Sequence, residues 1–182
     1  MITEVQTAKS RYLFYRVIGY LLVILSMFML LTAGVAVYFN EQSFWSYLTS
    51  SLLTISVGYS LVYKGRHDFV LMKRQLFLLT TLCWLSICLF ATLPFVLVLP
   101  GISYVDAVFE TVSAITTTGA TVLKGLDTMP RGLLFWRAVL QWIGGVGIIV
   151  MAIAILPALK IGGMKLFKTE NPDISEKILP RS

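Results

Sequence analysis

Four long stretches with almost no charged residue limit the fold of this chain more than any other feature. They run from Val17 to Phe39, from Phe44 to Tyr63, from Leu76 to Leu99 and from Leu133 to Leu159. Because a helix rises about 1.5 Å per residue, about 20 apolar residues cross the hydrocarbon core of a membrane. The sequence therefore predicts an all-α integral membrane protein with four spans.

The distribution of basic residues predicts the orientation of these spans. Of the 15 Lys and Arg residues, 12 lie in the N-terminus, in the loop between the second and third spans or in the tail after the fourth. Because cytoplasmic loops carry the excess of Lys and Arg, we expect both termini in the cytoplasm. The charge flanks the apolar stretches and forms no single cluster, so a nucleic-acid partner is not expected. Cys83 and Cys88, inside the third stretch, are interpreted as apolar packing residues.

Small residues and one proline indicate where helices pack closely or bend. Small residues recur every four positions in the second stretch, which predicts a helix face that a neighbouring helix approaches closely. Gly144 to Gly147 permit close contact or a bend in the last stretch, and Pro94 is expected to kink the third. The stripe in the second stretch consists of Ser46, Ser50, Thr54 and Gly58.

The segment before the last span, residues 101–131, is too long for a tight turn and too apolar for a disordered loop. Ser103 to Asp106 has the spacing of a capping box, and apolar residues then recur at helical spacing up to Val112. A helix from Tyr104 to Ile115 would be about 18 Å long, roughly half a bilayer. We therefore predict a re-entrant hairpin that enters from the outer side, surrounded by protein or by a water-filled path.

The tip of this hairpin is rich in hydroxyl groups beside a glycine, which favours a short extended strand of carbonyl and hydroxyl oxygens over a helix. A dehydrated potassium ion needs such oxygens in place of its water shell. Glycine can turn a carbonyl toward the ion through a positive φ, and the partly negative end of the preceding half-helix favours a cation. The predicted ion-binding residues are Thr116, Thr117, Thr118, Gly119 and Ala120, with the backbone carbonyls of Thr117, Thr118 and Gly119 as potassium ligands.

Three charged residues lie close to the hairpin in sequence. Asp106 and Glu110 are one turn apart on the predicted half-helix, and Arg137 lies inside the last span, where an unpaired charge is expensive. We predict that Arg137 pairs with Glu110 or Asp106 and braces the hairpin. The two carboxylates would otherwise attract cations at the outer mouth.

Several motifs together resemble one family of transport proteins. The strings DAVFE at 106–110 and SAITTTGAT at 113–121 resemble the first pore loop of Trk-type potassium uptake proteins. The match continues through FWR at 135–137, QWIGGVG at 141–147, ILP at 155–157, GGM at 162–164 and SEK at 175–177. The chain is most similar to the TrkH-like membrane subunit of the Trk/Ktr/HKT superfamily.

This resemblance implies a potassium-channel-like fold. In the family, four helix–pore loop–helix (M1-P-M2) repeats surround a central pathway, and TrkH-like members carry two extra helices first. Here residues 1–63 would hold the N-terminus and the two leading helices, and 64–75 a basic cytoplasmic loop. Residues 76–160 would form the first repeat, with its filter strand at 116–120. Residues 161–182 would be a cytoplasmic tail that starts the linker to a missing second repeat, so the chain resembles an N-terminal portion.

The resemblance also implies a function and partners. The function is potassium uptake across the bacterial inner membrane, with K⁺ as the transported ion, membrane lipid as the surroundings and no covalent cofactor. The expected partners are a second membrane subunit in a homodimer and a cytoplasmic TrkA-like subunit that binds nucleotide. The chain itself has no nucleotide-binding fingerprint.

Two other functions remain open from the residues alone. A single-repeat subunit could assemble as a homotetrameric channel, or the chain could be a membrane scaffold that transports nothing. An enzyme is not expected, since the sequence has no HExxH or GxSxG motif and no paired aspartates within the spans.

Overall fold

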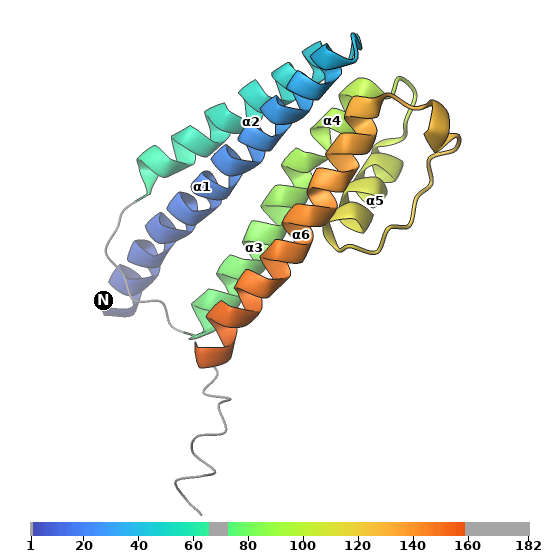
Figure 1. Cartoon of the computed structure of the whole chain (residues 1–182). Helices are drawn as coiled ribbons and strands as arrows, with labels where there is room; N and C mark the ends of the chain where they lie inside the picture. Colours follow the sequence, from blue (N-terminus) through green and yellow to red (C-terminus); the bar gives the residue numbers. More distant parts are fainter. Residues whose placement is uncertain (1, 66–72, 159–182) are drawn as a thin grey trace, which may run out of the picture.

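The computed structural model describes residues 2–65 and 73–158, and every regular element in these two ranges is helical. The helices pack as two long pairs side by side, with the shortest elements at one end and one side (Figure 1). The elements are α1 (Ile2–Tyr38), α2 (Phe44–Lys64), α3 (Lys73–Ala91), α4 (Leu93–Val98), α5 (Tyr104–Ile115), the 3₁₀ turn η1 (Leu126–Thr128) and α6 (Arg131–Ala158).

Helices α1 and α2 form an antiparallel leading hairpin. Gly19 and Gly58 meet at the crossing, where a Cβ on Gly19 would lie 2.7 Å from the Gly58 carbonyl oxygen. Closer to the turn between the two helices, the Ser51 hydroxyl donates to the Ser26 carbonyl at 3.0 Å. The predicted close-packing stripe is confirmed for its three buried members, which are Ser50, Thr54 and Gly58.

Three segments of the described residues are long and apolar enough to cross a membrane: Tyr12–Tyr38, Gln75–Val98 and Arg131–Ile153. The predicted spans at 17–39, 76–99 and 133–159 overlap these segments, with ends that differ by up to six residues. Helix α2 forms where the second span was predicted but falls outside this group, because its hydroxyl and tyrosine side chains lower its mean hydropathy. A fourth span at 44–63 therefore stays a prediction.

The third predicted span is divided by Pro94. Helix α3 ends at Ala91 and α4 begins at Leu93, with Pro94 in its first turn. The Trp136 indole N–H donates to the Ala91 carbonyl at 3.1 Å, and the Thr92 hydroxyl donates to Thr111 at 3.1 Å. The break thus ties the third span to both α5 and α6.

Helix α6 is continuous through Gly144 to Gly147, so these glycines permit contact and do not interrupt the helix. The predicted helix end at Gly162–Gly163, the tail at 161–182 and most of the basic loop at 64–75 lie outside the described residues. In Figure 1 the α1–α2 turn, α4 and the start of α6 lie at the same end, while α5 and η1 lie beside α6 on the side away from α2. This arrangement places α5 beside the first half of α6, with its last residue, Ile115, near the middle of that helix.

Candidate functional site

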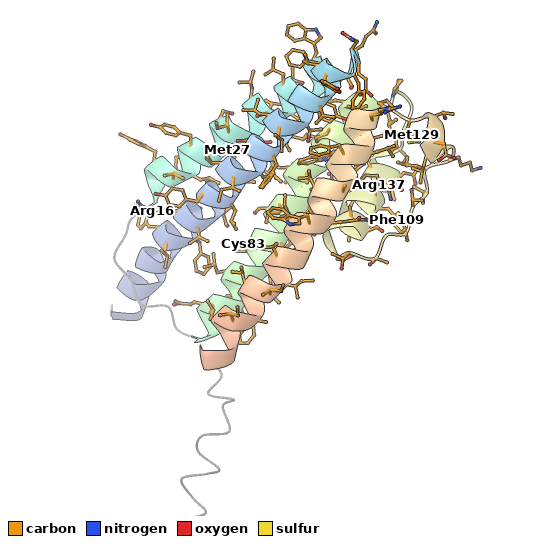
Figure 2. All side chains as sticks on the ribbon, viewed as in Figure 1. Arg16, Met27, Cys83, Phe109, Met129 and Arg137 are labelled. Atoms are coloured by element: carbon orange, nitrogen blue, oxygen red, sulfur yellow. The ribbon has the colours of Figure 1, made fainter. Side chains whose placement is uncertain are left out.

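Helix α5 spans Tyr104 to Ile115, the bounds predicted from the sequence. The Ser103 hydroxyl accepts the Val105 N–H at 3.2 Å. A capping box would require it to accept the N–H of Asp106 instead. Asp106 lies in the first turn, where a carboxylate is favourable beside the free amides. One face of α5 is buried, and Phe109 lies on the other face, 44% exposed (Figure 2).

The hydroxyl-rich segment curls around the C-terminal end of α5. The Thr117 N–H donates to the Ala114 carbonyl and the Thr118 N–H to the Ser113 carbonyl, each at 3.0 Å, which is the pattern of a Schellman motif. Thr117 takes a left-handed φ of 58° and Gly119 a φ of 76°. The predicted extended strand is therefore wrong at its first two residues, because Thr116 and Thr117 complete the helix end.

Residues 116–122 are exposed, so oxygen atoms of this segment are open to an ion or water. The Thr116 and Thr118 hydroxyls lie 2.8 Å apart, and the Ser113 hydroxyl donates to the Ala120 carbonyl at 2.6 Å. The five predicted ion-binding residues are thus brought together on one short turn. Among the described residues no group of three His, Cys, Asp or Glu side chains could hold a metal ion.

The Glu110 side chain holds the returning limb of the hairpin. It is fully buried, and its Oε1 accepts the Thr121 hydroxyl at 2.6 Å and the Val122 N–H at 2.7 Å. A third donor, the Leu123 N–H, lies 3.4 Å away. Sequence reasoning missed this role, although the hydroxyl of Thr121, two residues after Gly119, was a usable signal.

Arg137 approaches the other oxygen of the same carboxylate. Its Nε lies 3.1 Å from Glu110 Oε2, with the two side chains 11% and 0% exposed. Neither atom has a hydrogen-bond partner of good geometry, so the contact is an ion pair without an aligned hydrogen bond. Of the two carboxylates predicted to meet Arg137, the structure brings Glu110 to it, and Arg137 lies on the α5 side of α6 in Figure 2.

Gly144 provides a second contact between α6 and the hairpin. A Cβ at Gly144 would overlap the carbonyl oxygen of Ile115, the last residue of α5. By contrast, a Cβ at Gly145 would meet nothing within 4 Å. Only glycine at position 144 allows α6 to touch the backbone directly before the hydroxyl-rich segment.

Comparison with known proteins identifies the family of this chain. Residues 44–181 match the TrkH family model, described as a cation transport protein. The chain belongs to the TrkH family. This confirms the resemblance that its motifs predicted.

Individual relatives extend this similarity to most of the chain. A Trk system potassium uptake protein TrkI from Halomonas elongata is 44% identical over 92% of the chain, and TrkH from Vibrio parahaemolyticus is 43% identical over 86%. The crystal structure of the potassium transporter TrkH from Vibrio parahaemolyticus superposes with a TM-score of 0.75 and 37% identity, covering 87% of this chain and 35% of that one. The chain spans 34% and 33% of the length of the first two relatives, about a third.

Proposed function

We propose that this chain forms part of the pore-forming subunit of a Trk-type potassium uptake system, with Thr116 to Ala120 as one strand of its selectivity filter. The observation that carries the proposal is the hairpin. A helix of 12 residues ends in an exposed hydroxyl-rich turn, and a buried ion pair joins that hairpin to a membrane-length helix. The relatives whose names state potassium uptake support the choice of ion.

The chemistry of the turn suits a monovalent cation. Carbonyl and hydroxyl oxygens replace a potassium hydration shell without requiring a charged ligand. The carbonyl end of α5 adds a partial negative charge beside the turn, and Gly119 takes a positive φ that residues with a Cβ adopt poorly. We propose the carbonyls of Thr117, Thr118 and Gly119 as the ligands, with α3, α5 and α6 as the first M1-P-M2 repeat.

Helix α2 is proposed as a fourth span despite its lower hydropathy. Its hydroxyls bond back to carbonyls within the helix, as Ser50 does to Ser46 and Thr54 to Ser50, both at 2.7 Å. They therefore leave few polar groups to lipid. Exposed aromatic residues lie at both ends, with Trp45 68% exposed and Tyr63 85% exposed, as expected at the two membrane interfaces.

The distribution of basic residues and the family support the proposed orientation and partners. With both termini in the cytoplasm of a bacterial cell, an inward-moving K⁺ gains about 2.3 kcal/mol per 100 mV of inside-negative potential. A homodimer of the complete membrane subunit and a TrkA-like nucleotide-binding subunit complete the proposed system. No catalytic role is assigned to the chain.

A Gly119→Ser substitution tests the proposal. The variant is expressed from its natural gene in bacteria that lack their own potassium uptake. The left-handed φ at Gly119 disfavours any side chain, so we expect Rb⁺ uptake and its ratio to Na⁺ uptake to fall. Gly34→Ser is the matched control, because a Cβ there meets nothing within 4 Å. A membrane scaffold would be indifferent to both variants, and that result would reject the transport function. A single-repeat channel would instead show the mass of a homotetramer in detergent.

A further inference from the structure

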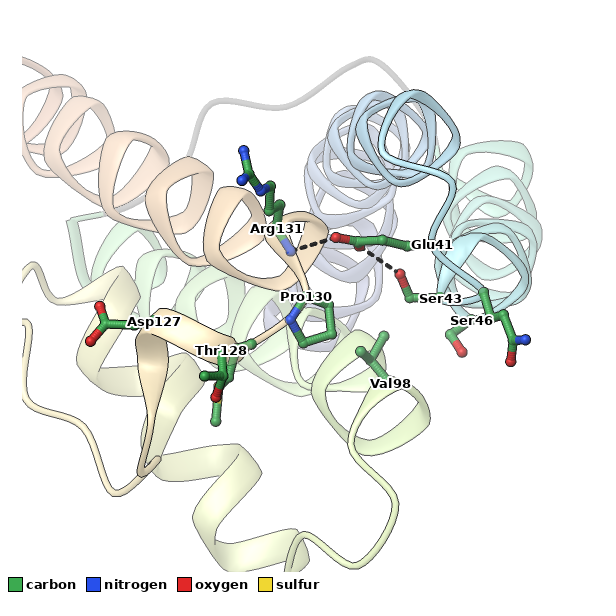
Figure 3. A pocket seen from close by; sticks show the side chains of 10 residues that line it. Glu41, Ser43, Ser46, Val98, Asp127, Thr128, Pro130 and Arg131 are labelled. Atoms are coloured by element: carbon green, nitrogen blue, oxygen red, sulfur yellow. Dashed lines mark hydrogen bonds between the residues drawn. The ribbon is translucent and has the colours of Figure 1, made fainter.

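The Glu41 side chain, in the turn between α1 and α2, caps the first turn of α6 from 90 residues away in sequence. Its Oε1 accepts the Arg131 N–H at 2.6 Å (Figure 3). Its Oε2 accepts the Gly132 N–H at 3.1 Å. The first amides of a helix have no partner within the helix. Since α6 has no acidic residue in its own first turn, Glu41 supplies the negative charge that this end favours.

Residues of the α1–α2 turn and of α6 both shape the contact between Glu41 and α6. Asn40 takes a left-handed φ of 55°, and the Glu41 N–H bonds back to the Ala36 carbonyl at 2.8 Å, so the backbone of the turn is fixed. The Ser43 hydroxyl donates to Glu41 Oε2 at 3.0 Å. On the other side, a Cβ at Gly132 would lie 3.1 Å from that same oxygen, so glycine leaves room for the carboxylate.

Helix α6 connects the contact with Glu41 to the hairpin. Arg137 lies six residues beyond Arg131, about 9 Å along the axis, and Gly144 lies about 20 Å along it. Both touch α5, through the Glu110 carboxylate and the Ile115 carbonyl. A helix that slides or rotates at its first turn moves both contacts together, since its backbone is rigid over this length.

We propose that Glu41 is a positioning residue for the ion-binding turn. It fixes the axial position and rotation of α6, and so the leading hairpin determines the geometry of residues 116–120 without touching them. This inference rests on the proposed function only where it concerns ion selectivity. Its structural half, that Glu41 controls the conformation of the turn, stands by itself.

The first test measures Rb⁺ and Na⁺ uptake by the Glu41→Gln variant. The variant is expressed from its natural gene in the same uptake-deficient bacteria. The amide keeps the size of the side chain but loses its charge and one acceptor. We expect the Rb⁺ to Na⁺ uptake ratio to fall by about two- to fivefold, because a weaker cap lets the first turn of α6 shift and so moves both of its contacts with α5. An unchanged ratio with less protein in the membrane would overturn the inference, because a merely structural cap would do only that.

Asp127→Asn is the matched control for charge. Asp127 lines the same pocket of about 680 Å³ as Glu41 but lies at its opposite side in Figure 3. Removing this charge should leave the ratio unchanged. An equal fall in both variants would mean that negative charge at the outer end matters and that the contact with α6 does not.

The second test does not depend on transport. In the purified chain with Cys83→Ala and Cys88→Ala, a Thr118→Cys substitution places one thiol on the turn, and a soluble maleimide measures its exposure. Adding Glu41→Gln should change the labelling rate at least about twofold, and adding Asp127→Asn should not. An altered rate without any Rb⁺ uptake by the unmodified protein would keep the positioning role and reject the proposed function. An unaltered rate would reject the positioning role.

Discussion

Helices α1 and α5 end with the same pattern of hydrogen bonds. The residues that take the left-handed conformation at the two ends differ greatly in how readily they adopt it. In α1 the Asn40 N–H donates to the Val37 carbonyl at 2.9 Å, and in α5 the Thr117 N–H donates to the Ala114 carbonyl at 3.0 Å. The two left-handed residues have φ values of 55° and 58°, and they are the non-glycine positions with positive φ in the described ranges. Asparagine visits this region readily, whereas β-branched threonine is a genuine outlier there.

This difference separates a turn fixed by its own sequence from one fixed by its surroundings. A left-handed residue with a Cβ costs about 1–2 kcal/mol, and such strain persists only where packing determines the backbone. The end of α5 is held by Gly144 against Ile115 and by Glu110 on both the returning limb and Arg137. We infer that the strain at Thr117 is maintained by α6 and belongs to the function of the turn.

Breaking the ion pair should remove this external support most severely. Arg137→Met leaves the fully buried Glu110 without its partner, and removing one member of a buried pair costs about 3–5 kcal/mol. We expect a large loss of folded protein in the membrane and a lower melting temperature in detergent. Arg131→Met, at an exposed arginine of the same helix, should cost far less.

The double variant Arg137→Met with Glu110→Met sharpens this result. It removes both charges and should recover part of the lost stability. If Arg137→Met left assembly intact and altered only ion preference, the bracing role of the pair would be wrong.

Gly144→Ala should come next in size. The added Cβ overlaps the Ile115 carbonyl, so α6 must move away from the end of α5 at a cost of about 3 kcal/mol. Thermal unfolding in detergent measures this loss, with Gly145→Ala as the control because its Cβ meets no atom. Equal effects of the two variants would show that helix propensity, and not this contact, decides the outcome.

At the α1 end, Asn40→Val should destabilise the chain by about 1–2 kcal/mol, because valine takes the left-handed conformation poorly. Asn40→Gly keeps that conformation accessible and should change the melting temperature little. A fully tolerated valine would mean that the turn is held from outside, as the α5 end is, and would remove the contrast between the two.

The sequence predicted the positions of the helices well, because helices depend on local patterns. Uncharged apolar stretches fixed α1, α3 and α6, and helical spacing after Ser103 fixed α5 to the residue. The Arg137–Glu110 pair was one of two expected pairs, since a charge inside a span needs a nearby partner.

Contacts between distant segments could not be predicted from these patterns. Nothing near Glu41 in sequence indicates that it caps a helix beginning at Arg131. The left-handed Thr117 was also missed, because the intrinsic preference of threonine argues against this conformation. The extended strand expected from threonine content was therefore wrong where tertiary contacts override local preference.

The smallest change in stability gives the most direct test of the central claim, that packing keeps the strained Thr117 for ion selection. Thr117→Gly relieves the left-handed strain, while Thr117→Asn relieves it and keeps a polar side chain. We predict that the free energy of unfolding rises by about 1 kcal/mol in both variants, so that both melt at a slightly higher temperature. We also predict that both lower the Rb⁺ to Na⁺ uptake ratio. Higher stability with an unchanged or higher ratio would contradict the claim.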